Sequence, residues 1–112
     1  MKINKDNALE RLKRNVTDFL YPIKMGGSVD LDAYNGLLLT LDEITRVYKE
    51  EQTLPKALLN EIFLTAEGVA SEACYIKTHD LNLMAEAILS KFNLLLASMT
   101  VDDNKRGIGR IV

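Results

Sequence analysis

The stretch that decides the fold is residues 31–51, which read LDAYNGLLLTLDEITRVYKEE. Its large apolar residues recur at steps of three and four, the spacing that places side chains on one face of an α-helix. Either Ser28 or Asp30 can cap the first turn with a side-chain oxygen. The stretch therefore predicts a helix over 31–51 that touches more than one neighbour. Its apolar face comprises Leu31, Tyr34, Leu37, Leu38, Leu41, Ile44 and Tyr48, widened by Leu39 and Val47.

On the N-terminal side, residues 6–24 have the same periodicity. Asp6 and Asn7 are candidate caps for this helix. Pro22 lacks a backbone N–H and disfavours helix at the residue before it, so a kink or an end is predicted there. Gly26-Gly27 then breaks the chain. The apolar stripe of this helix comprises Leu9, Leu12, Val16, Phe19, Leu20 and Ile23.

On the C-terminal side, two more helices are predicted, over 54–77 and 81–99. Thr53 can cap the first of them, and Pro55 fits its first turn. Asp80 is the best cap for the second. The inward-facing residues of the first are predicted to be Leu58, Leu59, Ile62, Phe63, Ala66, Val69, Ala70, Ala73 and Ile76. Those of the second are Leu81, Met84, Ile88, Leu89, Phe92, Leu95, Leu96 and Met99.

Four amphipathic helices with short connections predict an all-α, four-helix bundle-like single domain over residues 1–112. A chain of this length can build one continuous core without a metal or a disulfide. The tail, residues 100–112, has no helical periodicity and is predicted to be irregular. Only its last part, Gly107–Val112, has an alternation that would suit a short extended segment.

The charge balance argues against nucleic-acid binding. The chain has 14 Lys and Arg against 16 Asp and Glu, a net charge of −2, whereas general binding to nucleic acid needs a strongly basic surface. No apolar run is long enough to span a bilayer, and the polar N-terminus has no signal-peptide pattern. A single cysteine cannot form an internal disulfide, which suits a reducing compartment. We expect a cytoplasmic protein that binds neither nucleic acid nor membrane.

The sequence has no pattern typical of a catalytic or metal site. With one histidine, His79, and one cysteine, Cys74, a single chain cannot build a zinc site of the usual kind. His79 is predicted to be a polar turn residue, with a contact to a partner as the alternative. Cys74 falls among small apolar residues and is predicted to be a buried structural thiol, because a nucleophile would need an activating base. We expect no enzymatic activity and no cofactor.

The outer side of the predicted 54–77 helix is the main candidate for partner binding. This side is partly apolar, contains a glycine and has acids without nearby bases, unlike an ordinary solvated face. It suits a docking strip with an acidic rim, an aromatic anchor and flat backbone at the glycine. The alternative is that the first or fourth helix covers its apolar residues. The candidate residues are Glu61, Thr65, Gly68 and Glu72 along one line, flanked by Leu64 and Tyr75.

Charge is distributed unevenly among the predicted helices. Asp42 and Glu43, off the core face of the 31–51 helix, make that helix mostly acidic and form a second candidate set. The first helix is basic through Arg11, Lys13, Arg14 and Lys24. Such separated charges steer association and sharpen the choice of partner.

The run from Tyr34 to Leu96 resembles the small helical immunity proteins that neutralise NAD(P)-degrading type VI secretion effectors of bacteria. The resemblance covers a little over half the chain. It implies a cytosolic protein that plugs the active site of a cognate toxin by steric occlusion, with acidic residues of the second and third helices as the contact set. The shared features are Tyr34, the helix from Leu41 to Val47, Ala57-Leu58-Leu59, Leu64-Thr65, Val69-Ala70 and Asp80-Leu81-Asn82-Leu83.

Two other classes of function remain open from the sequence. One is a helical adaptor, regulator or self-associating scaffold, and the other is an enzyme or ligand-binding bundle. A toxin inhibitor predicts a partly acidic exposed patch that is flat or concave. A scaffold predicts a large apolar patch that closes by symmetry, and an enzyme predicts a deep pocket with converging polar groups. The sequence leaves the oligomeric state open, a homo-oligomer included.

Overall fold

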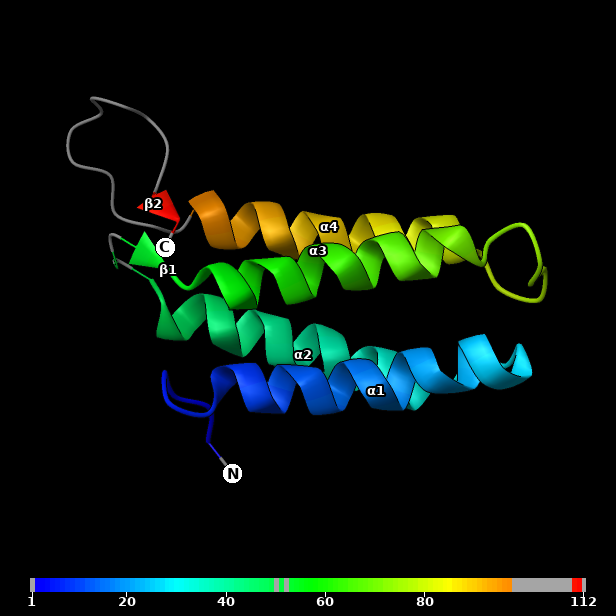
Figure 1. Ribbon diagram of the computed structural model, residues 1–112, viewed down its shortest axis with the longest axis horizontal. Coiled ribbons are helices and arrows are strands. Elements are labelled where there is room, and N and C mark those ends of the chain that lie inside the picture. Colours follow the sequence, from blue (N-terminus) through cyan, green and yellow to red (C-terminus); the bar gives the residue numbers. More distant parts are fainter. Residues whose placement is uncertain (1, 50, 52, 98–109, 112) are drawn as a thin grey trace.

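The computed structural model describes residues 2–49, 51, 53–97, 110 and 111. The described residues form four helices in an all-α fold, which confirms the predicted bundle-like class, and Figure 1 shows how these helices are arranged. The helices are α1 (Ala8–Gly26), α2 (Leu31–Val47), α3 (Lys56–Ser71) and α4 (Leu81–Ala97). Two short strands, β1 (Thr53–Leu54) and β2 (Arg110–Ile111), lie at one end of the bundle.

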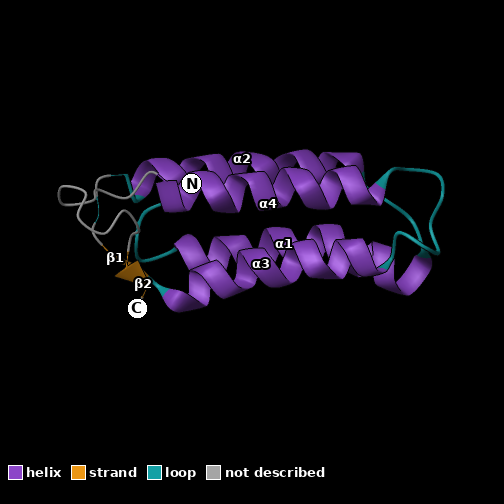
Figure 2. Ribbon diagram, turned by 90° about the horizontal axis from the view of Figure 1, so that it is seen from above, coloured by secondary structure: helices purple, strands orange, loops and turns teal. Residues whose placement is uncertain are grey.

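The four helices pack as two hairpins placed side by side. Within the hairpins α1 packs on α2 and α3 packs on α4, while α1 also contacts α3 and α2 contacts α4. Seen from above in Figure 2, α1 and α3 form one layer and α2 and α4 form the other. The helices within each layer run in the same direction (Figure 1). Although α2 and α3 are consecutive in the chain, they lie at opposite corners of the bundle.

The core is a continuous cluster of apolar side chains drawn from all four helices. Phe19 of α1 is fully buried, and its ring lies 5.3 Å from that of Tyr34 on α2, in a tilted arrangement. Across the bundle, Ile62 of α3 and Ile88 of α4 are buried to the same degree. The helical stripes predicted from the spacing of apolar residues therefore meet along the bundle axis.

Helix α1 does not end at Pro22 but continues to Gly26. The proline lacks the N–H that would bond one turn back, and the surrounding backbone bonds hold the helix through this gap. The true end is at Gly27, which adopts a left-handed φ of 65°. From there Gly27 N–H donates to the Ile23 carbonyl, and Ser28 N–H donates to the Pro22 carbonyl. These two backbone hydrogen bonds cap the C-terminus of the helix, and this type of cap favours glycine because it requires a left-handed residue.

The predicted caps of α2 and α4 are confirmed. The Asp30 carboxylate accepts the Ala33 N–H at 3.1 Å, and the Asp80 carboxylate accepts the Leu83 N–H at the same distance. The cap predicted at Asn7 is wrong, because its side chain makes no capping bond to α1. That side chain instead accepts the Asn4 N–H and donates to the Lys2 carbonyl, which orders the turn before the helix.

The predicted bounds of the second and third helices were too wide. Helix α2 ends at Val47 rather than at residue 51. Helix α3 begins at Lys56, after Pro55, and the Thr53 that was expected to cap it belongs to β1. It ends at Ser71 rather than at residue 77, and residues 72–75 form a turn. The apolar spacing continues past Ser71 into the turn, so helical periodicity alone does not show where the helix ends.

Part of the tail contributes to the fold. Strand β2 pairs with β1 in parallel, with Arg110 opposite Thr53 and Ile111 opposite Leu54. The predicted extended segment is therefore confirmed at these two residues. The rest of the tail, and the predicted end of the last helix at Met99, lie outside the described residues. The pairing brings the C-terminal end of the chain to the connection between α2 and α3.

Candidate protein-binding surface

The predicted line along α3 lies mostly against α1. A Cβ added at Gly68 would stand 3.3 Å from Leu20 Cδ2, so the glycine lies at the crossing of the two helices. Its backbone is therefore not the open, flat surface that was expected. One turn earlier, Thr65 is buried, and its hydroxyl donates to the Glu61 carbonyl at 2.7 Å. The glycine and the small threonine allow α1 to approach α3.

The expectation that the acids on this line lack nearby bases is wrong for Glu72. Its carboxylate lies 3.2 Å from Lys24 Nζ, which reaches across from α1. The Lys24 aliphatic chain also passes over Gly68, with Cε 3.6 Å from the position a Cβ would take. This ion pair satisfies Glu72 within the chain and reduces its capacity to attract a charged partner.

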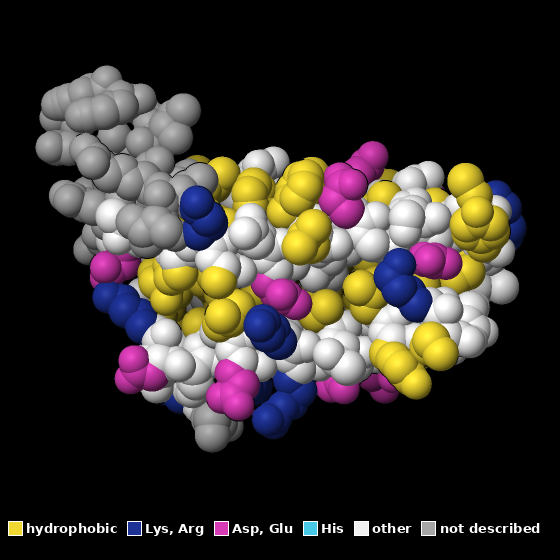
Figure 3. Space-filling view, viewed as in Figure 1, with side chains coloured by type: hydrophobic (Ala, Val, Ile, Leu, Met, Phe, Trp, Pro, Cys, Tyr) yellow, Lys and Arg dark blue, Asp and Glu magenta, His cyan; other side chains and the backbone are white. Residues whose placement is uncertain are grey.

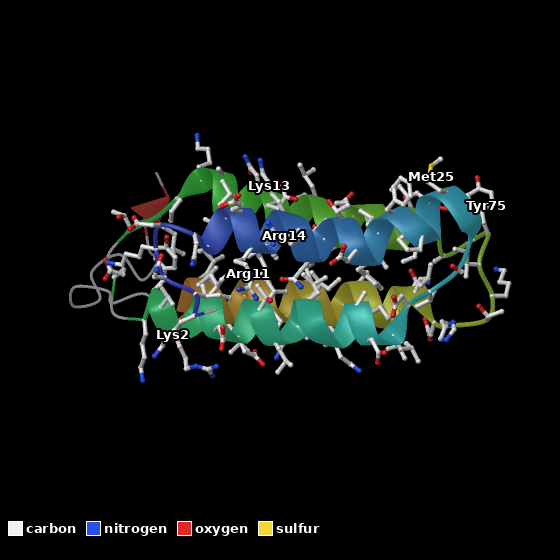
Figure 4. All side chains as sticks on the ribbon, turned by 90° about the horizontal axis from the view of Figure 1, so that it is seen from below. Lys2, Arg11, Lys13, Arg14, Met25 and Tyr75 are labelled. Carbon is white, nitrogen blue, oxygen red and sulfur yellow. The ribbon has the colours of Figure 1, made fainter. Side chains whose placement is uncertain are left out.

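The two apolar residues that flank the line are exposed, so neither the first nor the fourth helix covers them. The exposed fraction is 63% for Leu64 and 80% for Tyr75. Tyr75 follows α3, in the turn over 72–75. Figure 4 shows that Met25, at the C-terminal end of α1, lies at the same end of the molecule as Tyr75. Partner binding by Leu64 and Tyr75 stays a prediction.

The second candidate set is not brought together with the first. Asp42 of α2 forms an ion pair with Lys91 of α4, with 2.8 Å between the charged atoms. Its neighbour Glu43 lines a shallow depression with Lys2 and Arg46. Because α2 and α3 lie at opposite corners of the bundle, the predicted residues of these two helices form separate surfaces.

A different feature of α3 combines apolar and acidic side chains, namely a groove where it packs on α4. This α3/α4 groove has a volume of about 320 Å³. Its floor includes Ala66 and Ala85, both buried, and its rims carry Glu67 on α3 and Glu86 on α4, both exposed. Small floor residues let the two helices approach while leaving a hollow between their outer sides. The lining residues are Ala66, Glu67, Ala70, Asn82, Ala85, Glu86 and Leu89.

The rim carboxylates differ from those of Glu72 and Asp42, which are paired with lysines. Within the described ranges of the chain, neither Glu67 nor Glu86 lies within ion-pair distance of a base. In Figure 3, acidic side chains at the upper edge, over α3 and α4, have no basic side chain beside them. Basic side chains instead follow α1, as Arg11 and Arg14 do in Figure 4. The acids of the groove therefore lie on α3 and α4, whereas the predicted acidic set, Asp42 and Glu43, lies on α2.

The apolar floor continues one turn further along the groove. Phe63 of α3 and Phe92 of α4 lie there with ring centroids 6.1 Å apart, in a tilted arrangement that aromatic pairs favour. Phe63 and Ala70 were predicted to face inward, but Phe63 is 42% exposed and Ala70 is also exposed. The helical spacing places both on the groove side of α3, at the margin between core and solvent.

The sequence did not single out Glu67 and Glu86. Helical spacing does place Glu67 on the outer side of α3, opposite the buried Ile62 and Val69. The spacing within α3 cannot show which helix packs beside it, and the groove exists only because α4 packs there. The only indication in the sequence was that neither Glu67 nor Glu86 has a lysine or arginine one helical turn away.

The remaining reactive residues do not add to this surface. Cys74 is exposed, so the prediction of a buried thiol is wrong. The reason is that α3 ends before it and Cys74 lies in the turn. His79 lies in the connection to α4, where its Nδ1 is 3.1 Å from the Thr78 hydroxyl, as expected for a polar turn residue. Among the described residues, His, Cys, Asp and Glu side chains form no group of three that could hold a metal ion.

Two further findings concern membrane-spanning helices and similarity to known proteins. Along the parts of the chain that the structure describes, none of the helices combines the length and the hydrophobicity that crossing a bilayer requires. Compared with known proteins, the chain matches no family model, no curated protein and no solved structure.

Proposed function

We propose that this protein acts by binding another protein, and that a basic surface of the partner docks on the α3/α4 groove. The observation that carries the proposal is the pair of exposed carboxylates, Glu67 and Glu86, on the rims of an apolar groove without a base beside them. Unpaired surface charge of one sign steers an oppositely charged partner, and an apolar floor contributes affinity once water is excluded.

The groove suits a long basic side chain. A lysine or arginine can lay its aliphatic part along Ala70 and Leu89 while its charged end reaches Glu67 or Glu86. Arginine would add paired hydrogen bonds to a carboxylate. Leu64, which is exposed and precedes Glu67 by one turn, extends the same side of α3 and supplies an apolar contact beside the groove.

A narrower form of the proposal comes from the resemblance to immunity proteins. In that form the partner is a secreted toxin that degrades NAD(P), and the acidic groove docks at its basic active-site cleft in the cytoplasm. The toxin is inhibited by steric occlusion, without any chemistry by this chain. A helical adaptor or regulator would use the same groove for a different basic partner, which makes it the alternative function.

The test is affinity capture from a lysate of the source organism with three baits. These are the wild type, a groove variant with Glu67→Lys and Glu86→Lys, and a control with Asp18→Lys and Asp32→Lys. The control makes the same change of charge at exposed positions on α1 and α2. We expect a basic protein to be captured by the wild type and the control and lost with the groove variant. The same captured proteins with all three baits would contradict the proposal.

The narrower form is tested on the captured protein. If it is a toxin of the proposed class, it consumes NAD⁺ or NADP⁺, and one equivalent of this protein stops the reaction. The groove variant should then fail to inhibit at the same concentration, whereas the control should inhibit fully. A captured protein without this activity would overturn the toxin form and favour the adaptor or regulator.

A further inference from the structure

The outer side of the layer formed by α2 and α4 has no neighbour among the four helices, and it carries four large exposed apolar side chains among polar ones such as Asn35. It presents Leu31 and Leu39 from α2, which are 47% and 65% exposed, and Leu83 and Leu94 from α4, which are 61% and 55% exposed. We define these residues as the leucine face. A helix surface that only meets water would carry charged residues at most of these positions.

The Asp42–Lys91 ion pair shows that these leucines share one side of the molecule. Its 2.8 Å contact fixes α2 and α4 at the same height along the bundle. Leu39 precedes Asp42 by three residues and Leu94 follows Lys91 by three, so each lies one turn from the ion pair. Leu31 precedes Asp42 by eleven residues and Leu83 precedes Leu94 by eleven, a spacing that returns to nearly the same side of a helix.

The leucine face is large enough for a specific contact. Helices of 17 residues are about 25 Å long, and neighbouring helices lie about 10 Å apart, which gives a two-helix face of roughly 500 Å². Two such faces would bury roughly 1,000 Å² together, the lower limit for a specific interface. Single exposed leucines are common on monomers, but four of them on one side of two neighbouring helices, around an ion pair, provide the mixture of apolar and polar groups found in specific interfaces.

We infer that the leucine face is where two copies of this chain associate around a twofold axis. A twofold axis that lies in the plane of the face, parallel to the helices, places α2 of one copy against α4 of the other in parallel orientation. The α2 helix carries an acid in this face and the α4 helix carries a base, so Asp42 of each copy approaches the part of the second copy that bears Lys91. The face is therefore complementary to itself in both charge and hydrophobicity.

The charge of the face favours a second copy over a charged partner. Asp42 and Lys91 cancel, so the face attracts neither an acidic nor a basic surface, in contrast to the groove with Glu67 and Glu86. The two surfaces use different sides of α4, because Ala85 and Leu89 in the groove lie more than about 100° around the helix from Leu83 and Leu94. Self-association is therefore compatible with partner binding at the groove and does not depend on it.

The first test measures the mass of the full chain in solution from micromolar to millimolar concentration, by sedimentation or light scattering. We expect a reversible dimer for the wild type. Combining Leu39→Glu with Leu83→Glu should weaken it by more than about tenfold in Kd, while Leu64→Glu should leave it unchanged. Leu64 is a matched control, because it is 63% exposed on α3, away from this face. A wild type that stays monomeric throughout, or a dimer lost only with Leu64→Glu, would overturn the inference.

The second test uses charge to probe the twofold arrangement. Asp42→Lys and Lys91→Asp each break the ion pair within the chain and place like charges across the interface, so each variant alone should dimerise more weakly than the wild type. Mixing the two should restore dimers of one copy of each, because opposite charges then meet between copies. Absence of rescue on mixing, with both variants folded by circular dichroism, would overturn the proposed arrangement.

Discussion

Gly68 of α3 lies beneath Leu20 of α1, and a Cβ added to the glycine would stand 3.3 Å from Leu20 Cδ2. This relationship explains why the line predicted on α3 is not an open strip. The first helix takes up the space above the glycine, and Lys24 then reaches Glu72 one turn further along. The part of α3 that remains accessible to a partner is its outer side next to α4, where the groove lies.

The two helical glycines should respond differently to alanine. In a helix interior, alanine is favoured over glycine by about 1 kcal/mol. A Cβ at Gly36 would meet only Asn15 Nδ2 at 3.7 Å, an ordinary contact, so Gly36→Ala should raise the unfolding free energy by about this amount. Gly68→Ala must move the end of the Leu20 side chain, so its gain should be about half as large or less. Urea unfolding measures both, and an equal gain at the two sites would argue against the close crossing.

A buried hydrogen bond should couple α1 to α2. The Thr40 hydroxyl, almost fully buried, donates to the Asn15 side-chain oxygen at 2.7 Å. Thr40→Val or Asn15→Ala alone should each lower the unfolding free energy by about 1–2 kcal/mol, because the remaining polar group loses its partner. The double variant should lose less than the sum. A double-mutant cycle by urea unfolding checks this, and strict additivity would show that the bond contributes nothing to stability.

The cap of α4 should depend on the side-chain oxygen rather than on the negative charge alone. Asp80→Ala removes the acceptor of the Leu83 N–H and should cost about 1 kcal/mol of unfolding free energy. Asp80→Asn keeps an oxygen in the same place and should cost only a few tenths of a kcal/mol. Thermal unfolding of the two variants compares them directly. Equal losses would mean that the charge, and not the hydrogen bond, stabilises this end of the helix.

Stability should fall at alkaline pH because Tyr48 is buried and Tyr34 is partly buried. Burial raises the pKa of Tyr34 and of Tyr48 above the ordinary value of 10.0, although Lys91 and Lys5 respectively oppose the rise. Above pH 10 the unfolded chain therefore loses these protons before the folded chain does, and the unfolding free energy decreases as pH rises. Below pH 10 this stabilisation is fully present.

Replacing both residues by phenylalanine isolates their share of this effect. The variant with Tyr34→Phe and Tyr48→Phe should lose less stability between pH 9 and pH 11 than the wild type. The reason is that phenylalanine has no proton whose loss is coupled to unfolding. The midpoint of urea unfolding at a series of pH values provides the measurement. An unchanged slope in the variant would show that other groups cause the alkaline loss.

The helices could be predicted because their evidence is local. Apolar spacing and capping residues such as Asp30 and Asp80 act within one or two turns, and both caps are present in the structure. The errors also have local causes. Pro22 lies inside a helix that neighbouring bonds maintain, and the residues after Ser71 keep an apolar pattern although they form a turn.

The surface could be predicted only in part, because it depends on which helices are neighbours. The sequence left open whether another helix covers Leu64 and Tyr75, and the structure shows both exposed. The position of Gly68 beneath Leu20, and of Asp42 beside Lys91, follows from contacts between residues far apart in the chain. No spacing within one helix contains that information, and the groove between α3 and α4 was missed for the same reason.

Methyl NMR would show directly whether a basic partner docks on the α3/α4 groove. The captured protein is added to this chain labelled at alanine and leucine methyl groups, and the shift of each signal is followed. We expect the largest changes at Ala70 and Leu89, in the groove. Changes at Leu39 and Leu83 without changes at Ala70 and Leu89 would contradict groove docking, because the partner would then bind the outer side of α2 and α4.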